Sequence, residues 1–180
     1  MLTITIPAKE FWDETKQEFV YVDETILSLE HSLISISKWE SRWQKPFLSK
    51  DKKTQEETVD YIRCMTLTRN LNSAVYNGLT QENYKAIDEY ISSPMSATWF
   101  REDSASKRSS EQITSELIYY WMVALGIPFE CEKWHLNRLL TLIRICNIKN
   151  QPTKKHSKRE IMNQNAALNA ARRAQIRSKG

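Results

Sequence analysis

The most strongly patterned part of the chain is ITSELIYYWMVALGIPFECEKWHLNRLLTLIRICN, residues 113–147. Its first half repeats apolar side chains at three- and four-residue steps, which is the period of an α-helix facing a core. These side chains are Ile113, Leu117, Tyr120, Trp121, Ala124 and Leu125. We expect this helix to begin near Ser109, where Gln112 would complete a capping box. Gly126 can adopt the positive φ that ends a helix, and Pro128 prevents its continuation.

A second helix is predicted from near Phe129 to about Asn147. Its apolar side chains again recur at helical steps, and they form an unusually wide stripe. They are Leu136, Leu139, Leu140, Leu142, Ile143, Ile145 and Cys146. A stripe this wide implies contact on more than one side, with neighbouring helices or with another subunit. The two predicted helices should form an antiparallel helical hairpin.

The same stretch contains residues that resemble a metal or thiol site. Cys131 and His135 are four residues apart and could share one face of a helix. However, Cys146 would lie roughly 22 Å from Cys131 along a straight helix, too far for one zinc ion. The negative charges of Glu130 and Glu132 would also oppose a reactive thiolate at Cys131. We therefore expect the cysteines to fill gaps in the core and His135 to lie at its margin, with no metal, cofactor or catalytic residue.

The first thirty residues predict an antiparallel β-hairpin. Apolar and polar side chains alternate in LTITI, residues 2–6, as in a half-buried strand. Residues 18–30, EFVYVDETILSLE, are rich in β-branched and aromatic residues, with Phe19, Tyr21, Leu27 and Leu29 at even spacing. Residues 7–17 are expected to connect the two strands.

Three further helices are predicted between the hairpin and residue 113. The first follows Ser32, carries Trp39 and Trp43 on one face, and ends before Pro46. The second opens with a capping box of Thr54 and Glu57, and the third is capped by Thr80, in the manner of helix N-termini. The predicted class is therefore mainly α, within α+β: a helical domain with an N-terminal antiparallel β-hairpin and a basic helical tail.

Composition excludes several classes of protein. The chain has only three glycines, whereas phosphate-binding loops and dinucleotide-binding turns need several at close spacing. No run approaches the roughly 18 apolar residues of a membrane span, and we recognise no secretory signal. Three cysteines without a CxxC pair are typical of free thiols in a reducing compartment.

Charge is distributed unevenly along the chain. Residues 152–180 hold eight basic residues and one acidic residue, a balance of +7, whereas residues 1–151 hold 18 and 21, a balance of −3. We therefore expect three regions: the β-hairpin region at 1–30, a helical core at 31–150, and a basic helical or disordered tail at 151–180. Ser157 and Glu160 could cap a tail helix that runs towards Arg177.

The basic tail has two possible functions. Lys and Arg side chains can neutralise phosphates and release counterions, as in arms that bind DNA or RNA. Yet the tail contains no Phe, Tyr or Trp to stack on bases. The favoured interpretation is a solvated or loosely docked helix that contacts an acidic protein surface.

Four stretches resemble the tail assembly chaperones of long-tailed, siphovirus-type bacteriophages. They are LEHSLISISKWESRWQKPFL, residues 29–48; YIRCMTLT, residues 61–68; ITSELIYYWMVALGIPFECEKWHLNRLLTLIRIC, residues 113–146; and NAALNAARRAQ, residues 165–175. The similarity covers nearly the whole chain. It lies in the overall amino-acid sequence of these stretches and not in a mechanistic motif.

This resemblance implies a non-enzymatic factor that acts in the host cytoplasm and is absent from the finished virion. Such chaperones bind the long, helical tape measure protein, keep it soluble and help tail tube subunits assemble around it. In that family a longer form is often made by translational frameshifting. Apolar grooves between helices suit a helical client.

We expect the partner-binding residues to lie on the predicted helical hairpin and on the tail. They are Trp121, Trp134, Arg138, Leu142, Ile145, Ile161, Leu168, Arg172 and Arg173. The expected partners are the tape measure protein and the tail tube protein, with self-association also open. Two alternatives are kept: a nucleic-acid-binding module that uses the basic arm, and a structural tail or head-completion protein of the virion.

Overall fold

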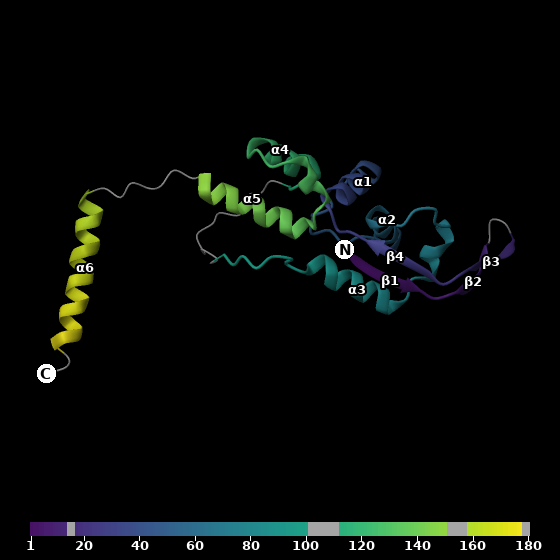
Figure 1. Cartoon of the computed structure of the whole chain (residues 1–180), viewed down its shortest axis with the longest axis horizontal. Helices are drawn as coiled ribbons and strands as arrows, with labels where there is room; N and C mark the ends of the chain where they lie inside the picture. The colour runs from purple at the N-terminus through teal and green to yellow at the C-terminus, as the bar shows by residue number, and fades with distance from the viewer. Residues whose placement is uncertain (14–16, 101–111, 151–157, 178–180) are drawn as a thin grey trace. The chain divides into compact units, whose positions relative to one another are not determined.

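A computed structural model describes residues 1–13, 17–100, 112–150 and 158–177 of the chain (Figure 1). It confirms the predicted class, which is mainly helical α+β with small antiparallel sheets. The chain divides into two units, Met1–Asn147 and Ile148–Gly180, which are described separately below. The N-terminal strands belong to the first unit.

The N-terminal hairpin is a long two-stranded ribbon. β1 (Leu2–Ile6) pairs with β4 (Thr25–Leu29), and β2 (Lys9–Asp13) pairs with β3 (Glu18–Val22). Ile6 lies opposite Thr25 in the first sheet, and Lys9 lies opposite Val22 in the second. The residue numbers of each pair sum to 31, so the two sheets share one strand register. The two sheets are therefore sections of one ribbon, interrupted at residues 7–8 and 23–24.

Two predictions about this ribbon were wrong. Residues 7–17 were expected only to connect the strands, but they contain β2. Pro7 has no backbone N–H and therefore interrupts the ladder, which resumes two residues later. Phe19 and Tyr21 were grouped with Leu27 and Leu29, yet the first two are exposed and the last two are buried. Beyond the interruption the ribbon turns its other face inwards, and Val22 is buried instead.

The three predicted helices that follow the ribbon are confirmed. They are α1 (Leu33–Trp43), α2 (Gln55–Met65) and α3 (Gln81–Ser92), and a 3₁₀ helix, η1 (Ser73–Gly78), precedes α3. Thr54 and Thr80 cap the second and third helices as expected, and Ser32 caps the first. Each cap side chain accepts a hydrogen bond from a backbone N–H three residues later, which satisfies a donor that the first helical turn leaves free.

These helices enclose the inner section of the ribbon. α1 packs on α2, and the indole N–H of Trp39 donates to the Glu57 carbonyl at 2.9 Å. α3 packs on β1, where the Asn83 amide donates to the Thr5 carbonyl at 3.2 Å. The chain leaving α2 runs beside β4, and Leu67 N–H donates to the Ser28 carbonyl at 2.8 Å. The core therefore lies between the ribbon and its helices. Its fully buried members include Ile6, Leu27, Leu29, Leu33, Ile36, Ile62 and Met65.

The first helix of the patterned stretch starts later than predicted. α4 (Ser115–Ala124) has Thr114 as its N-cap, whereas the predicted start, Ser109, lies outside the described residues. The predicted glycine stop is confirmed, because Gly126 has φ +64°. Ile127 N–H then donates to the Met122 carbonyl at 2.8 Å, as in a Schellman motif.

The second helix of the stretch is broken, so its predicted start near Phe129 was wrong. A short 3₁₀ helix, η2 (Phe129–Lys133), is followed by extended Trp134 and then by α5 (Leu136–Asn150). The cause is a tertiary contact, since Ser32 and His135 form an isolated antiparallel β-bridge. α4 packs on α1 and makes few backbone contacts with α5, so the two helices do not form the closely packed antiparallel hairpin that was predicted.

The second unit contains the predicted tail helix, α6 (Lys158–Arg177). Its expected cap, Ser157, lies outside the described residues. The described side chains of α6 are exposed within their unit, among them Met162 and Leu168. A search of the described helices found none that is both long and apolar enough to span a bilayer.

Candidate protein-binding surface

The outer side of α4 is an exposed apolar surface. Ser115, Ile118 and Met122 are buried, whereas Tyr120 and Val123 are 65% and 63% exposed. A helix that is apolar on all sides is normally covered on all sides. Here one side of α4 has no cover from the described part of this chain.

This arrangement corrects the predicted inward stripe. Three of its members are exposed and three are half-buried: the exposed ones are Ile113, Tyr120 and Ala124, and the half-buried ones are Leu117, Trp121 and Leu125. Because α4 carries apolar residues all round, its periodicity does not determine which side faces the core. Packing against α1 determines it. The stripe therefore lies across the outer side of α4.

A buried carboxylate anchors this helix. Glu40 of α1 is 7% exposed, and one of its oxygens accepts a hydrogen bond from Phe47 N–H at 2.8 Å. The other oxygen accepts one from Ser115 N–H, at the first turn of α4, at 2.7 Å. A negative charge at a helix N-terminus is favoured by the helix dipole. Glu40 thereby joins the first turn of α4 to α1, next to the Thr114 cap.

The exposed apolar surface continues into η2. Phe129 is exposed, and its ring centroid lies 6.3 Å from that of half-buried Tyr119. The Tyr119 hydroxyl donates to Glu132 at 2.8 Å, which ties α4 to η2. Burial and this hydrogen bond raise the pKa of Tyr119, so its hydroxyl stays protonated. We call the exposed side chains of Tyr120, Val123, Ala124 and Phe129 the α4 surface.

The structure does not bring the predicted partner-binding residues together. Trp121, Leu142 and Ile145 are half-buried. Trp134 is also half-buried, and the exposed guanidinium group of Arg138 lies over its ring at 4.2 Å from the centroid. This arrangement shields one face of the indole. The predicted apolar residues of α5 therefore pack mainly against the rest of the protein. The exposed apolar side chains of the patterned stretch lie on α4 instead.

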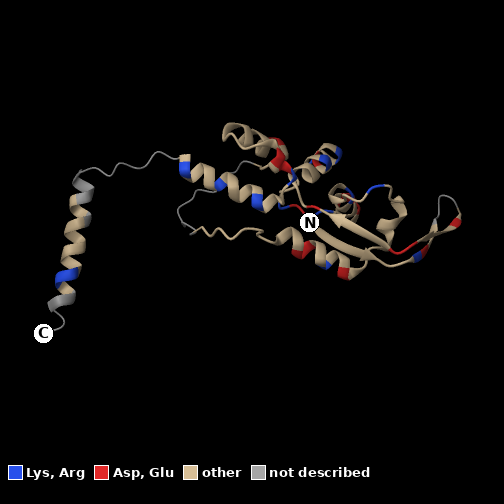
Figure 2. Cartoon of the chain, viewed as in Figure 1, with Lys and Arg blue, Asp and Glu red and all other residues tan. Residues whose placement is uncertain are grey.

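The remaining predicted residues belong to α6. Leu168, Arg172 and Arg173 are exposed there, and the side chain of Ile161 lies outside what the structure describes. Figure 2 marks basic residues along α5 and α6, and acidic residues on α3 and the ribbon.

A second exposed apolar patch was missed. Trp12, Phe19 and Tyr21 are all more than half exposed on one face of the outer ribbon. Trp12 lies opposite Phe19, with ring centroids 4.9 Å apart and edge to face, and Tyr21 is one pair further along that face. The alternation of these residues with Phe11 and Val20 was the available signal. It went unused because residues 7–17 were interpreted as a connection.

The histidine of the patterned stretch is deeper than predicted. His135 is buried and not at the core margin, and its Nε2 donates to the Tyr90 carbonyl at 3.0 Å. Beside it, His31 Nδ1 and the Tyr61 hydroxyl share a 2.5 Å hydrogen bond. These contacts place both rings in the packing of the core.

Cys131 is a buried free thiol. Burial and the charge of Glu130 raise the pKa of the Cys131 thiol, in the direction predicted from the sequence. Within the described ranges, no three His, Cys, Asp or Glu side chains are arranged to hold a metal ion.

Comparisons with protein-family models, with curated proteins and with solved structures found no match to this chain. The functional inference therefore rests on the sequence resemblance and on the chain's own surfaces.

Proposed function

We propose that this protein is a non-enzymatic assembly chaperone of long-tailed bacteriophages. Its client is the tape measure protein, which it keeps soluble in the host cytoplasm while the tail assembles, and the tail tube protein is a second partner. The sequence resemblance suggests this role, and the α4 surface is the observation that best supports it.

The α4 surface suits a helical client. An amphipathic helix presents apolar side chains at i, i+3, i+4 and i+7, and these pack against an apolar helix face or groove. Tyr120 and Val123 lie three residues apart on α4 and therefore project side by side. Rings such as those of Tyr120 and Phe129 offer a large contact area with few rotatable bonds, which keeps the entropy cost of binding low.

The size of the α4 surface favours reversible binding. Tyr120, Val123 and Phe129 are 65%, 63% and 56% exposed, so burying their exposed parts would contribute about 1–2 kcal/mol each. Association costs at least about 4 kcal/mol in lost freedom of motion, and often more. The two contributions are of similar magnitude, so binding at this surface alone is weak and reversible.

Co-expression tests this proposal. The tape measure protein is produced with the full chain, and its soluble fraction and co-purification are measured. Tyr120→Glu and Val123→Glu should each lower both quantities, because a charge on the α4 surface opposes burial against an apolar client. Leu67→Glu is the matched control, since Leu67 is 55% exposed on the segment that follows α2 and its substitution should change neither quantity.

Three results would overturn the proposal. The first is a tape measure protein whose solubility does not depend on this chain. The second is a loss of client binding in Leu67→Glu equal to that in the two α4 variants, which would show that binding does not depend on the α4 surface. The third is this chain in purified virions, which would instead indicate a structural tail or head-completion protein.

A further inference from the structure

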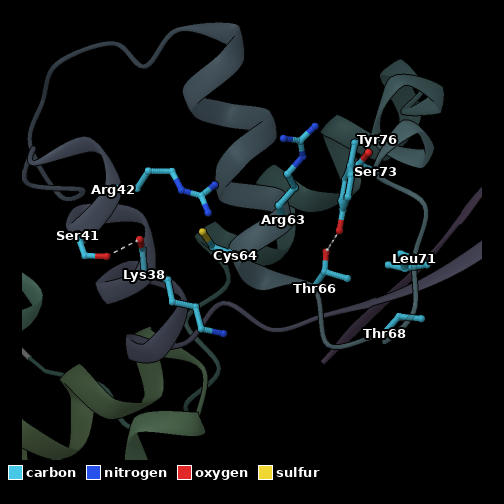
Figure 3. A pocket seen from close by; sticks show the side chains of 10 residues that line it. All are labelled: Lys38, Ser41, Arg42, Arg63, Cys64, Thr66, Thr68, Leu71, Ser73 and Tyr76. Carbon is cyan, nitrogen blue, oxygen red and sulfur yellow. Dashed lines mark hydrogen bonds between the residues drawn. The ribbon is translucent and has the colours of Figure 1, made fainter. Parts of the chain in front are cut away.

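A pocket of about 780 Å³ lies between α1, α2 and η1, away from the α4 surface. Figure 3 shows Lys38 and Arg42 entering it from α1, Arg63 and Cys64 from the end of α2, and Tyr76 from η1. The remaining lining residues are Ser41, Thr66, Thr68, Leu71 and Ser73. The lining thus contains three cations and no carboxylate, in a region of the sequence, residues 1–151, whose overall charge is −3.

The hydroxyl groups of this pocket are largely engaged within the protein. Thr66 donates to the Ile62 carbonyl at 2.8 Å and lies 3.0 Å from the Tyr76 hydroxyl, which donates to it. Ser41 donates to the Lys38 carbonyl at 3.0 Å. The donors left for a ligand are therefore mainly the cationic side chains.

The three cations are held differently. Arg42 forms an ion pair with buried Asp60, which also accepts from the Trp43 indole at 2.9 Å. Arg63 lies over the Tyr76 ring, 5.2 Å from its centroid, and this contact fixes its guanidinium group at the pocket wall. Within the described part of the chain, no carboxylate forms an ion pair with Lys38 or Arg63.

We propose that this pocket binds a carboxylate-bearing segment of a partner protein, with Arg63 and Lys38 as its ligands. A guanidinium group that is already oriented can donate two parallel hydrogen bonds to one carboxylate, and a lysine adds a flexible second charge. Arg42 remains in its ion pair with Asp60 and adds to the positive electrostatic potential of the pocket. This site is separate from the α4 surface and does not depend on the identity of the client.

An acidic protein segment fits the pocket better than a nucleic acid. Binding to a phosphate backbone needs a continuous track of cations, because each neutralised phosphate contributes through counterion release. Here two unpaired cations lie in an acidic body, and the only lining aromatic, Tyr76, is covered by Arg63. A short run of Asp or Glu matches this small positive site.

The test measures binding of the full chain to a fluorescein-labelled peptide of alternating Glu and Ser. A peptide with Gln in place of Glu is the ligand control. Lys38→Gln and Arg63→Gln should each weaken binding about fivefold, and added salt should weaken it further. Both side chains are exposed, so the urea midpoint should change little, by no more than the loss of the contact between Arg63 and Tyr76.

Two other surface lysines provide a matched protein control. Lys50→Gln with Lys149→Gln removes two charges, as does Lys38→Gln with Arg63→Gln, and both control lysines are exposed. Only the pocket pair should weaken peptide binding by more than tenfold. An equal loss in the Lys50 and Lys149 pair, or equal binding of the Gln peptide, would overturn the proposal. Tight binding of oligothymidine that disappears in the variant with Lys38→Gln and Arg63→Gln would identify a nucleic-acid site instead.

Discussion

The imidazole rings of His31 and His135 meet edge to face in the core, with their centroids 5.0 Å apart. They are 2% and 6% exposed. The Leu136 N–H donates to the His31 carbonyl at 2.7 Å, so backbone and side chains together join the end of the ribbon to the start of α5. Two rings this close and this buried are stable only when both are neutral.

Acidification should therefore destabilise the fold. Burial, reinforced by His135, lowers the pKa of His31 from 6.5 to about 3, and burial also lowers the pKa of His135. Below pH 6.5 the unfolded chain binds more protons than the folded chain. The contribution of the neutral rings is thus complete above pH 6.5 and is lost as the pH falls, by up to about 1.4 kcal/mol per pH unit for each histidine. Urea midpoints between pH 7.5 and pH 5 measure this slope.

A His31→Gln variant separates titration from packing. Its stability at pH 7.5 should fall, because the contact with Tyr61 is lost. Its dependence on pH should nevertheless become flatter, because one shifted group is gone. A variant with the full slope of the original protein would contradict the assignment to this pair.

Glu40→Gln should cost about 2–3 kcal/mol of stability. The amide keeps one acceptor oxygen and presents an NH₂ group to the other backbone donor, so either Phe47 N–H or Ser115 N–H loses its partner. Hydrogen exchange should show the first turn of α4 opening more often. Glu89→Gln is the control: Glu89 is exposed in a 3.9 Å pair with Lys85, so this change should cost less than about 0.5 kcal/mol.

Thr54→Ala should cost about 1 kcal/mol, because it removes the cap of α2. The Thr54 hydroxyl accepts from Glu57 N–H at 3.2 Å, and the Glu57 carboxylate accepts from Thr54 N–H at 2.8 Å. Thr54→Ser keeps the hydroxyl and should retain nearly full stability in the same urea titration. Equal losses in the two variants would show that the hydroxyl is not the cause.

Gly126→Ala should cost about 1 kcal/mol through the backbone alone. Gly126 has φ +64°, and an added Cβ would meet no atom within 4 Å. Gly126→Asn should cost less, since asparagine tolerates this conformation better than alanine. Thermal unfolding of the two variants compares them, and a loss greater for Asn than for Ala would point to side-chain crowding.

Local signals predicted much of the fold. The starts at Ser32, Thr54 and Thr80 were correct because a cap bonds to the backbone only two or three residues away. The stop at Gly126 was correct for the same reason, since its motif closes within one turn. The alternation of Leu2, Ile4 and Ile6 likewise predicted a strand, and its two deeper residues are buried.

Non-local contacts account for the parts that were wrong. The helix expected from Phe129 is interrupted because residues around His135 pair with Ser32, a hundred residues earlier in the chain. The seating of α4 on α1 depends on a carboxylate of α1, which accepts from Ser115 N–H. Neither partner lies within the window that a local pattern covers.

The candidate binding residues were the hardest to predict for a related reason. Leu142 and Ile145 seemed free to bind because their stripe was wide, and Tyr120 seemed buried because its stripe was regular. Sequence alone determined the antiparallel pairing of strands at the N-terminus, the capped helices, the basic tail and their order. Only the tertiary structure decided which side of α4 faces water, because every side of that helix is apolar and only the contact with α1 distinguishes one side from another.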